Sequence, residues 1–98
     1  MIWFVSRHAG AREWAIGQGL QWDAELQHLS GSPVSRGDRV YGTLPCHLAA
    51  LVCSSGAEYW HLEVPVSAAM RGGELSADAL QALGARFVRY AVKTMEPE

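Results

Sequence analysis

Short apolar runs and stretches with helical spacing alternate along this chain. Residues 2–5 form an apolar run of the length of a buried strand, and residues 9–20 carry apolar side chains at helical spacing. Residues 22–29 alternate between apolar and polar side chains, which favours a half-buried strand. Residues 30–38 are rich in Ser, Gly and Pro and predict turns. The first part of the chain therefore predicts a strand, a helix and a second strand.

A second unit of the same kind follows these turns. Residues 39–43 predict a brief strand, and residues 44–56 predict a helix with Pro45 in its first turn, where a missing N–H costs little. Residues 58–66 predict another strand, which Pro65 ends. Strands that alternate with helices in this way are typical of a parallel sheet.

The last part of the chain allows two interpretations. Ser76 is a good N-cap for a helix, and Gly84 is placed to end it. Apolar and polar residues then alternate over residues 86–94, which favours a strand. The alternative is a helix that continues through Gly84, because helical spacing is also kept by Leu80, Leu83, Phe87 and Ala91. If residues 86–94 form a strand, the order of elements predicts one α/β domain over residues 1–98. This domain would contain a mainly parallel sheet flanked by helices.

The balance of charge limits the partners of this chain. Its formal net charge is −2, from 8 Lys and Arg against 10 Asp and Glu, and Lys93 is its single lysine. Proteins bind duplex DNA and long RNA mainly by neutralising many phosphates, so this balance argues against such partners. It is compatible with a small anion held by a few arginines and backbone amides.

Length and cysteine content point to a small cytoplasmic protein. A chain of 98 residues builds one core but no deep cleft of its own, so we expect a functional pocket to be shared between two copies. Cys46 and Cys53 lie two helical turns apart, roughly 10 Å, which is too far for a disulfide. Free thiols fit a reducing compartment. The sequence has no signal peptide and no membrane-spanning apolar run, so we expect a cytoplasmic protein that does not enter a membrane.

Candidate chemistry lies where the first strand ends. Ligands of open parallel sheets bind beyond the carboxyl ends of the strands, where helix N-termini offer N–H groups to a phosphate. Ser6, Arg7 and His8 occupy this position. Arg7 could neutralise a phosphate or the charge that develops on phosphorus, and His8 could transfer a proton near neutral pH. The alternative is that Arg7 and His8 only satisfy the end of the strand.

A second junction has the same form. Gly42, Thr43 and Leu44 lead into a helix that carries His47 in its first turn. If the two strands are parallel neighbours, both junctions open on one crevice. The alternative is that this motif only provides the geometry by which the chain enters a helix.

Other polar residues carry weaker signals. His28 and His61 lie within strand patterns and fit core or surface positions better than ligand positions. Arg71 is either a lid residue or a solvated loop charge. Cysteines and histidines show no metal-ligand spacing, and no close carboxylate pair suits Mg²⁺, so we expect no metal and no other cofactor. Phosphodiester cleavage without metal is feasible on RNA, because the ribose 2′-OH is a nucleophile that leaves a 2′,3′-cyclic phosphate.

Three stretches, in order, resemble a known family. They are FVSRHAGAREWA, GDRVYGTLPCHLAALVCSSGAEYWHLEVPV and RGGELSADALQALGAR. They resemble the small CRISPR-associated accessory proteins of type III systems, number sixteen in the Csx series, over nearly the whole chain. The resemblance implies a Rossmann-like fold related to the CARF group, a homodimer, and cyclic oligoadenylate as ligand. It also implies a ring nuclease that cleaves cyclic tetra-adenylate and so ends antiviral signalling.

The resemblance also implies site residues. The Ser-Arg-His-x-Gly-Ala motif matches Ser6, Arg7, His8, Gly10 and Ala11, and the Gly-Thr-Leu-Pro-x-His motif matches Gly42, Thr43, Leu44, Pro45 and His47. We assign Arg7 and His8 as catalytic. The residues that we assign as ligand-binding are Ser6, Gly10, Gly42, Thr43, Leu44, Pro45, His47 and Arg71. In this hypothesis the helix-start amides and Arg7 hold a phosphodiester in line with its 2′-OH. His8 serves as general base or acid, and Arg7 stabilises the phosphorane.

Three other functions stay open from the sequence. The same arginines and amides would serve a sponge that binds the messenger without cutting it. A histidine phosphatase is a weaker alternative, because an Ala interrupts the Arg-His-Gly motif that such enzymes carry. An interaction module without nucleotide chemistry is the third.

Overall fold

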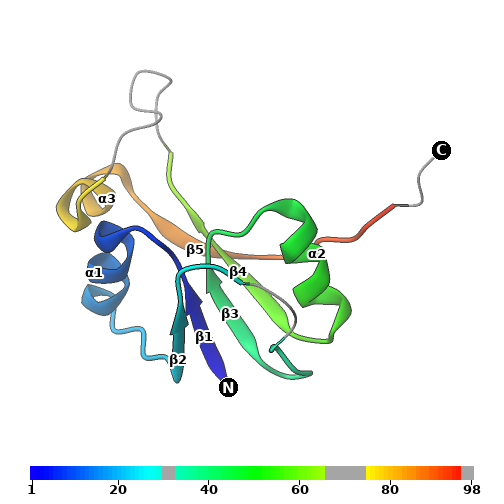
Figure 1. Ribbon diagram of the computed structural model, residues 1–98. Helices are drawn as coiled ribbons and strands as arrows, with labels where there is room; N and C mark the ends of the chain where they lie inside the picture. Colours follow the sequence, from blue (N-terminus) through cyan, green and yellow to red (C-terminus); the bar gives the residue numbers. More distant parts are fainter. Residues whose placement is uncertain (30–32, 66–74, 96–98) are drawn as a thin grey trace.

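The computed structural model describes residues 1–29, 33–65 and 75–95 and shows one five-stranded sheet with helices on both faces (Figure 1). The strands are β1 (Ile2–Val5), β2 (Ala24–Leu26), β3 (Arg39–Gly42), β4 (Glu58–Glu63) and β5 (Arg86–Tyr90). The helices of the described residues are α1 (Ala9–Gly17), α2 (Cys46–Ser54) and α3 (Ala77–Leu83).

The sheet has the order β2-β1-β3-β4-β5. Neighbours are parallel from β2 to β4, and β5 is antiparallel to β4. The prediction of an α/β fold with a mainly parallel sheet is therefore confirmed. The chain leaves β1 towards β2 on one side and leaves β3 towards β4 on the other, so the winding of the sheet reverses between β1 and β3.

The C-terminal element is the strand that alternation predicts. The Ser76 hydroxyl caps α3 by accepting the Ala79 N–H at 3.1 Å. Gly84 ends the helix with a φ of 81°, a left-handed conformation that glycine adopts without strain. Because α3 stops there, the alternative of a helix through Gly84 is wrong. The expected irregular crossing over residues 66–74 lies outside the described residues.

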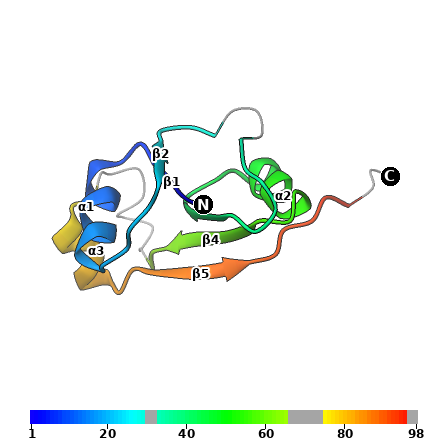
Figure 2. The ribbon, with the colours of Figure 1, turned by 90° about the horizontal axis from the view of Figure 1, so that it is seen from below.

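Helices α1 and α3 lie on one side of the sheet and α2 on the other (Figure 2), and one core cluster lies against each face of the sheet. Side chains alternate across the sheet in β1, so Phe4 faces α1 and α3 while Trp3 and Val5 face α2. The same alternation places Tyr59 of β4 on the α2 face and Leu62 on the opposite face. Because β1, β3 and β4 run parallel, their carboxyl ends lie at the same edge of the sheet, between the two helical layers.

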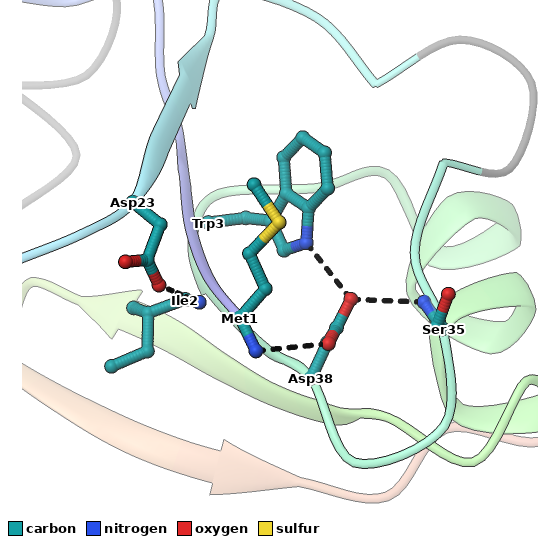
Figure 3. A network of polar contacts seen from close by, with 6 residues as sticks. All are labelled: Met1, Ile2, Trp3, Asp23, Ser35 and Asp38. Carbon is teal, nitrogen blue, oxygen red and sulfur yellow. Dashed lines mark hydrogen bonds and ion pairs between the residues drawn. The ribbon is translucent and has the colours of Figure 1, made fainter.

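Asp38 ties the beginning of β3 to the beginning of β1 (Figure 3). Its carboxylate accepts the Ser35 N–H at 3.0 Å and the indole N–H of Trp3 at 3.1 Å, and it pairs with the Met1 amino group at 3.1 Å. These contacts, the Ser35 bond foremost, lower the pKa of Asp38 to about 2. The charged carboxylate therefore anchors the edge of the sheet opposite to the strand ends that carry the candidate chemistry.

Two expectations about the chain as a whole can be compared with the structure. Cys46 and Cys53 are free thiols, as their spacing predicts. Over residues 1–29, 33–65 and 75–95, the helices lack the length and apolar character needed to cross a bilayer.

Candidate functional site

The two junctions predicted to meet are neighbours in the structure. Val5 of β1 pairs with Gly42 of β3, so Ser6 and Thr43 leave adjacent parallel strands at the same edge. The strands are closely packed here, because a Cβ on Gly42 would lie 2.0 Å from the Val5 oxygen, and Gly42 has a φ of 143°. Glycine is therefore required at position 42 by the approach of two backbones, independently of any ligand.

A pocket of about 500 Å³, here named the switch-point pocket, opens between these strand ends on the α2 side of the sheet. Apolar side chains from both junctions form its floor, and polar side chains form its rim. Its lining residues are Val5, Ser6, Arg7, His8, Gln27, His28, Leu29, Thr43, Leu44, Pro45 and Leu48. One arginine and two imidazoles thus face a pocket whose described lining holds no carboxylate, which favours an anionic ligand.

His8 stands at the rim between two hollows. It is the exposed N-cap of α1, and its N–H donates to the Ser6 hydroxyl at 3.1 Å. Ser6, His8 and Thr43 also line a smaller hollow of about 200 Å³ on the α1 and α3 side of the sheet. An imidazole here can reach a ligand that passes over the edge of the sheet, and the first-turn N–H groups of α1 add partial positive charge.

The structure separates some of the predicted ligand residues from this pocket. His47 is exposed on α2 and lines a different hollow with Leu51 and Lys93. Gly10 is buried against the backbone just before α3, where a Cβ would lie 1.9 Å from the Leu75 oxygen, so packing explains the glycine at this position. Arg71 lies outside the described residues.

Leu44 contributes its apolar side chain to the pocket, whereas its N–H group is engaged within the protein. Its N–H donates to the Tyr59 hydroxyl at 2.9 Å, and the Thr43 N–H faces the Val5 oxygen at 3.4 Å. These amides are engaged within the protein, so the N–H groups left for an anion at this junction are those of the first turn of α2. Leu44 itself supplies apolar wall, and Pro45 is the N-cap of α2.

Sequence reasoning missed Gln27 and His28. The strand predicted over residues 22–29 ends at Leu26, so both residues follow the carboxyl end of β2, beside β1. They are exposed and line the switch-point pocket. A shorter strand ending before His28 would have revealed them by the same strand-end rule that found Arg7 and His8.

A polar cluster lies beyond the Leu44 wall, on the part of β4 and β5 that faces α2. The Tyr59 hydroxyl lies 2.6 Å from Nδ1 of His61, and burial raises the pKa of Tyr59. The Tyr90 hydroxyl donates to Glu63, which lowers the pKa of Glu63 and raises that of Tyr90. This cluster lines a separate hollow of about 200 Å³, and Leu44 borders both hollows.

Metal binding gives no further signal in the part of the chain that the structure describes. No group of three His, Cys, Asp or Glu side chains lies close enough there to hold an ion.

The fold and the pocket define an open, doubly wound α/β protein with a ligand-sized hollow at its switch point. Residues 3–93 match the model of the family described as "Putative CRISPR-associated protein (Cas_VVA1548)". The chain belongs to this family of CRISPR-associated proteins, which confirms the CRISPR association expected from the sequence. The comparisons with curated proteins and with solved structures gave no match.

Proposed function

We propose that this protein is a ring nuclease of type III CRISPR systems that binds and cleaves cyclic oligoadenylate, with a CARF-related fold. The observation that carries the proposal is the switch-point pocket, which Arg7, His8 and His28 line beyond the ends of the neighbouring parallel strands β1 and β2. A pocket with cationic groups, apolar walls and helix N-termini suits a nucleotide phosphate. The membership in a CRISPR-associated family supplies the context for a nucleotide messenger.

Two copies of the chain would form the complete site. The switch-point pocket, at about 500 Å³, is in the size range of sites for single small ligands. A ring of four nucleotides extends beyond such a pocket. A homodimer with twofold symmetry would present two equivalent pockets to the symmetric ring.

The proposed reaction uses the nucleophile of the substrate. Arg7 and the first-turn amides of α1 hold one phosphodiester, and the neighbouring ribose 2′-OH attacks phosphorus in line with the leaving 5′-oxygen. As a base, His8 accepts the proton of the 2′-OH, and the leaving 5′-oxygen takes a proton from water. As an acid, His8 donates a proton to the leaving oxygen, and water accepts the proton of the 2′-OH. The P–O5′ bond breaks, and the product ends in a 2′,3′-cyclic phosphate. The chemistry requires no metal, because substrate and side chains supply nucleophile, proton transfer and charge.

The test is incubation of the purified protein with cyclic tetra-adenylate in EDTA, with the products resolved by mass. We expect linear oligoadenylates that carry 2′,3′-cyclic phosphate. Binding that leaves the ring intact after long incubation would instead identify a sponge. A melting temperature that no cyclic oligoadenylate raises would contradict both, because ligand at about 100 times its Kd adds about 2.7 kcal/mol to stability.

Two arginine variants distinguish a specific contact of the Arg7 guanidinium with the ligand from a general effect of positive charge on binding. Arg7→Ala should weaken binding about tenfold or more, the effect of removing a charge-assisted hydrogen bond. Arg89→Ala is the matched control, because Arg89 lies exposed on β5 at 4.0 Å from Glu58, away from the switch-point pocket. Equal losses in both variants would contradict the assignment of the site.

A further inference from the structure

Tyr59 and His61 lie behind the Leu44 wall of the switch-point pocket. Tyr59 is 3% exposed, and its hydroxyl oxygen accepts the Leu44 N–H at 2.9 Å. The same oxygen lies 2.6 Å from Nδ1 of His61. One buried hydroxyl therefore joins the main chain of the pocket wall to a titratable ring.

The proton of the Tyr59 hydroxyl has two acceptors within reach. Nδ1 of His61 is at 2.6 Å, and the carbonyl oxygen of Gly42 is at 3.5 Å. Donor and acceptor roles at Nδ1 depend on the tautomer of His61. We assign the proton to the shorter contact, which corresponds to a neutral His61 with its own proton on Nε2. Burial, which raises the pKa of Tyr59, keeps this hydroxyl protonated and able to donate.

Protonation of His61 changes this arrangement. Both ring nitrogens then donate, so Nδ1–H points at the Tyr59 oxygen. That oxygen already accepts from Leu44, and its own proton must turn towards the Gly42 carbonyl. Gly42 and Leu44 flank Thr43, which lies on the rim of the switch-point pocket. A change at His61 is thus transmitted to both sides of Thr43.

Several other groups face His61. Glu63 lies on the same face of β4, the Tyr90 ring of β5 is edge-on to it at 5.8 Å, and Cys46 of α2 lines the same hollow. Glu63 is engaged by the Tyr90 hydroxyl and by Arg86 at 3.3 Å. Among these side-chain types, histidine is the one that ordinarily changes charge between pH 5 and 8.

We propose that Tyr59 and His61 are positioning residues for the switch-point pocket. The protonation state of His61, relayed by the Tyr59 hydroxyl, sets the hydrogen bonding of Gly42 and Leu44 and thereby the affinity of the pocket for its phosphate ligand. The relay is a property of the free protein, whereas its effect on a nucleotide rests on the proposed function.

The first test uses NMR on the free protein. The Leu44 amide proton should shift with pH at the midpoint of the His61 ring. In His61→Asn the amide oxygen still accepts from Tyr59 but does not titrate, so the Leu44 shift should become independent of pH. His28→Asn is the matched control, because it removes an imidazole from the rim of the switch-point pocket and should leave the pH dependence of the Leu44 amide shift intact.

Each result decides the proposal. A Leu44 amide that stays constant while His61 titrates would overturn it, as would a titration that persists in His61→Asn. Tyr59→Phe should also uncouple the two residues, and if that variant does not fold, His61→Asn still gives the answer.

The second test measures binding of cyclic tetra-adenylate across the same pH range. His8 and His28 are present in both proteins, so the readout is the difference between wild type and His61→Asn. We expect the wild-type affinity relative to His61→Asn to change about fivefold or more between the two ends of the range. Parallel pH profiles would refute control of affinity. If no ligand binds, the proposed function fails, while the amide titration still tests the relay.

Discussion

Replacing Gly10 by alanine should destabilise the protein, although alanine is the better helix former. A Cβ at this position would lie 1.9 Å from the Leu75 oxygen, against an ordinary contact of 3.4 Å or more. The obstacle is backbone, so α1 and the start of α3 have to move apart. Overpacking of this kind costs about 1–3 kcal/mol, and we expect its upper end because a main-chain carbonyl cannot change rotamer. Helix propensity returns about 1 kcal/mol, which leaves a net loss of about 2 kcal/mol.

Gly17 provides a matched control on the same helix. A Cβ there meets no atom within 4 Å, and the residue is exposed at the end of α1. Gly17→Ala should therefore keep the stability or raise it by up to about 1 kcal/mol.

Urea unfolding followed by tryptophan fluorescence measures both variants. With a slope of about 1–2 kcal/mol per molar urea, Gly10→Ala should lower the midpoint by about 1–2 M. An unfolding free energy of Gly10→Ala within about 0.5 kcal/mol of wild type would refute the packing explanation for this glycine.

Three further predictions concern the rest of the fold. Tyr59→Phe leaves the buried Leu44 N–H without its acceptor and should cost about 1–3 kcal/mol in urea unfolding, whereas Tyr90→Phe, at an exposed hydroxyl, should shift the midpoint far less. The lowered pKa of Asp38 gives stability that is present above its unfolded value of about 4 and is lost as pH falls towards about 2. Asp38→Asn should therefore weaken the pH dependence of the melting temperature in that window, and an unchanged profile would contradict this. Ser76→Ala removes the cap of α3 and should lower the unfolding free energy by about 1 kcal/mol, while no measurable change would show that the cap contributes nothing.

Local patterns were sufficient to predict the fold. The apolar run of β1, the N-cap Ser76 and the left-handed Gly84 each act over a few neighbouring residues, so their effect can be read from the chain. The position of Arg7 and His8 at a strand end was predictable for the same reason. That Ser6 and Thr43 are neighbours required the further condition that β1 and β3 pair in parallel, which the structure supplies.

The composition of the site depended on contacts between distant segments. Gly10 matches a motif of the family that the sequence resembles, but the reason for glycine there is the Leu75 carbonyl, which lies far along the chain. His47 matches a motif as well, yet the rotation of α2 turns it towards another hollow. His28 was assigned to a strand because alternation continues past the residue where pairing with β1 stops. Hydrophobic spacing does not encode such tertiary placements.

The central claim is that chemistry occurs at the switch-point pocket, and two histidine variants test it most directly. Single-turnover cleavage of cyclic tetra-adenylate in EDTA should slow about 100-fold or more in His8→Ala while the ring still binds, the usual loss of a general acid or base. His47→Ala should cleave at the wild-type rate, because His47 lines a different hollow. Undiminished cleavage by His8→Ala, or no cleavage by the wild type, would contradict the account.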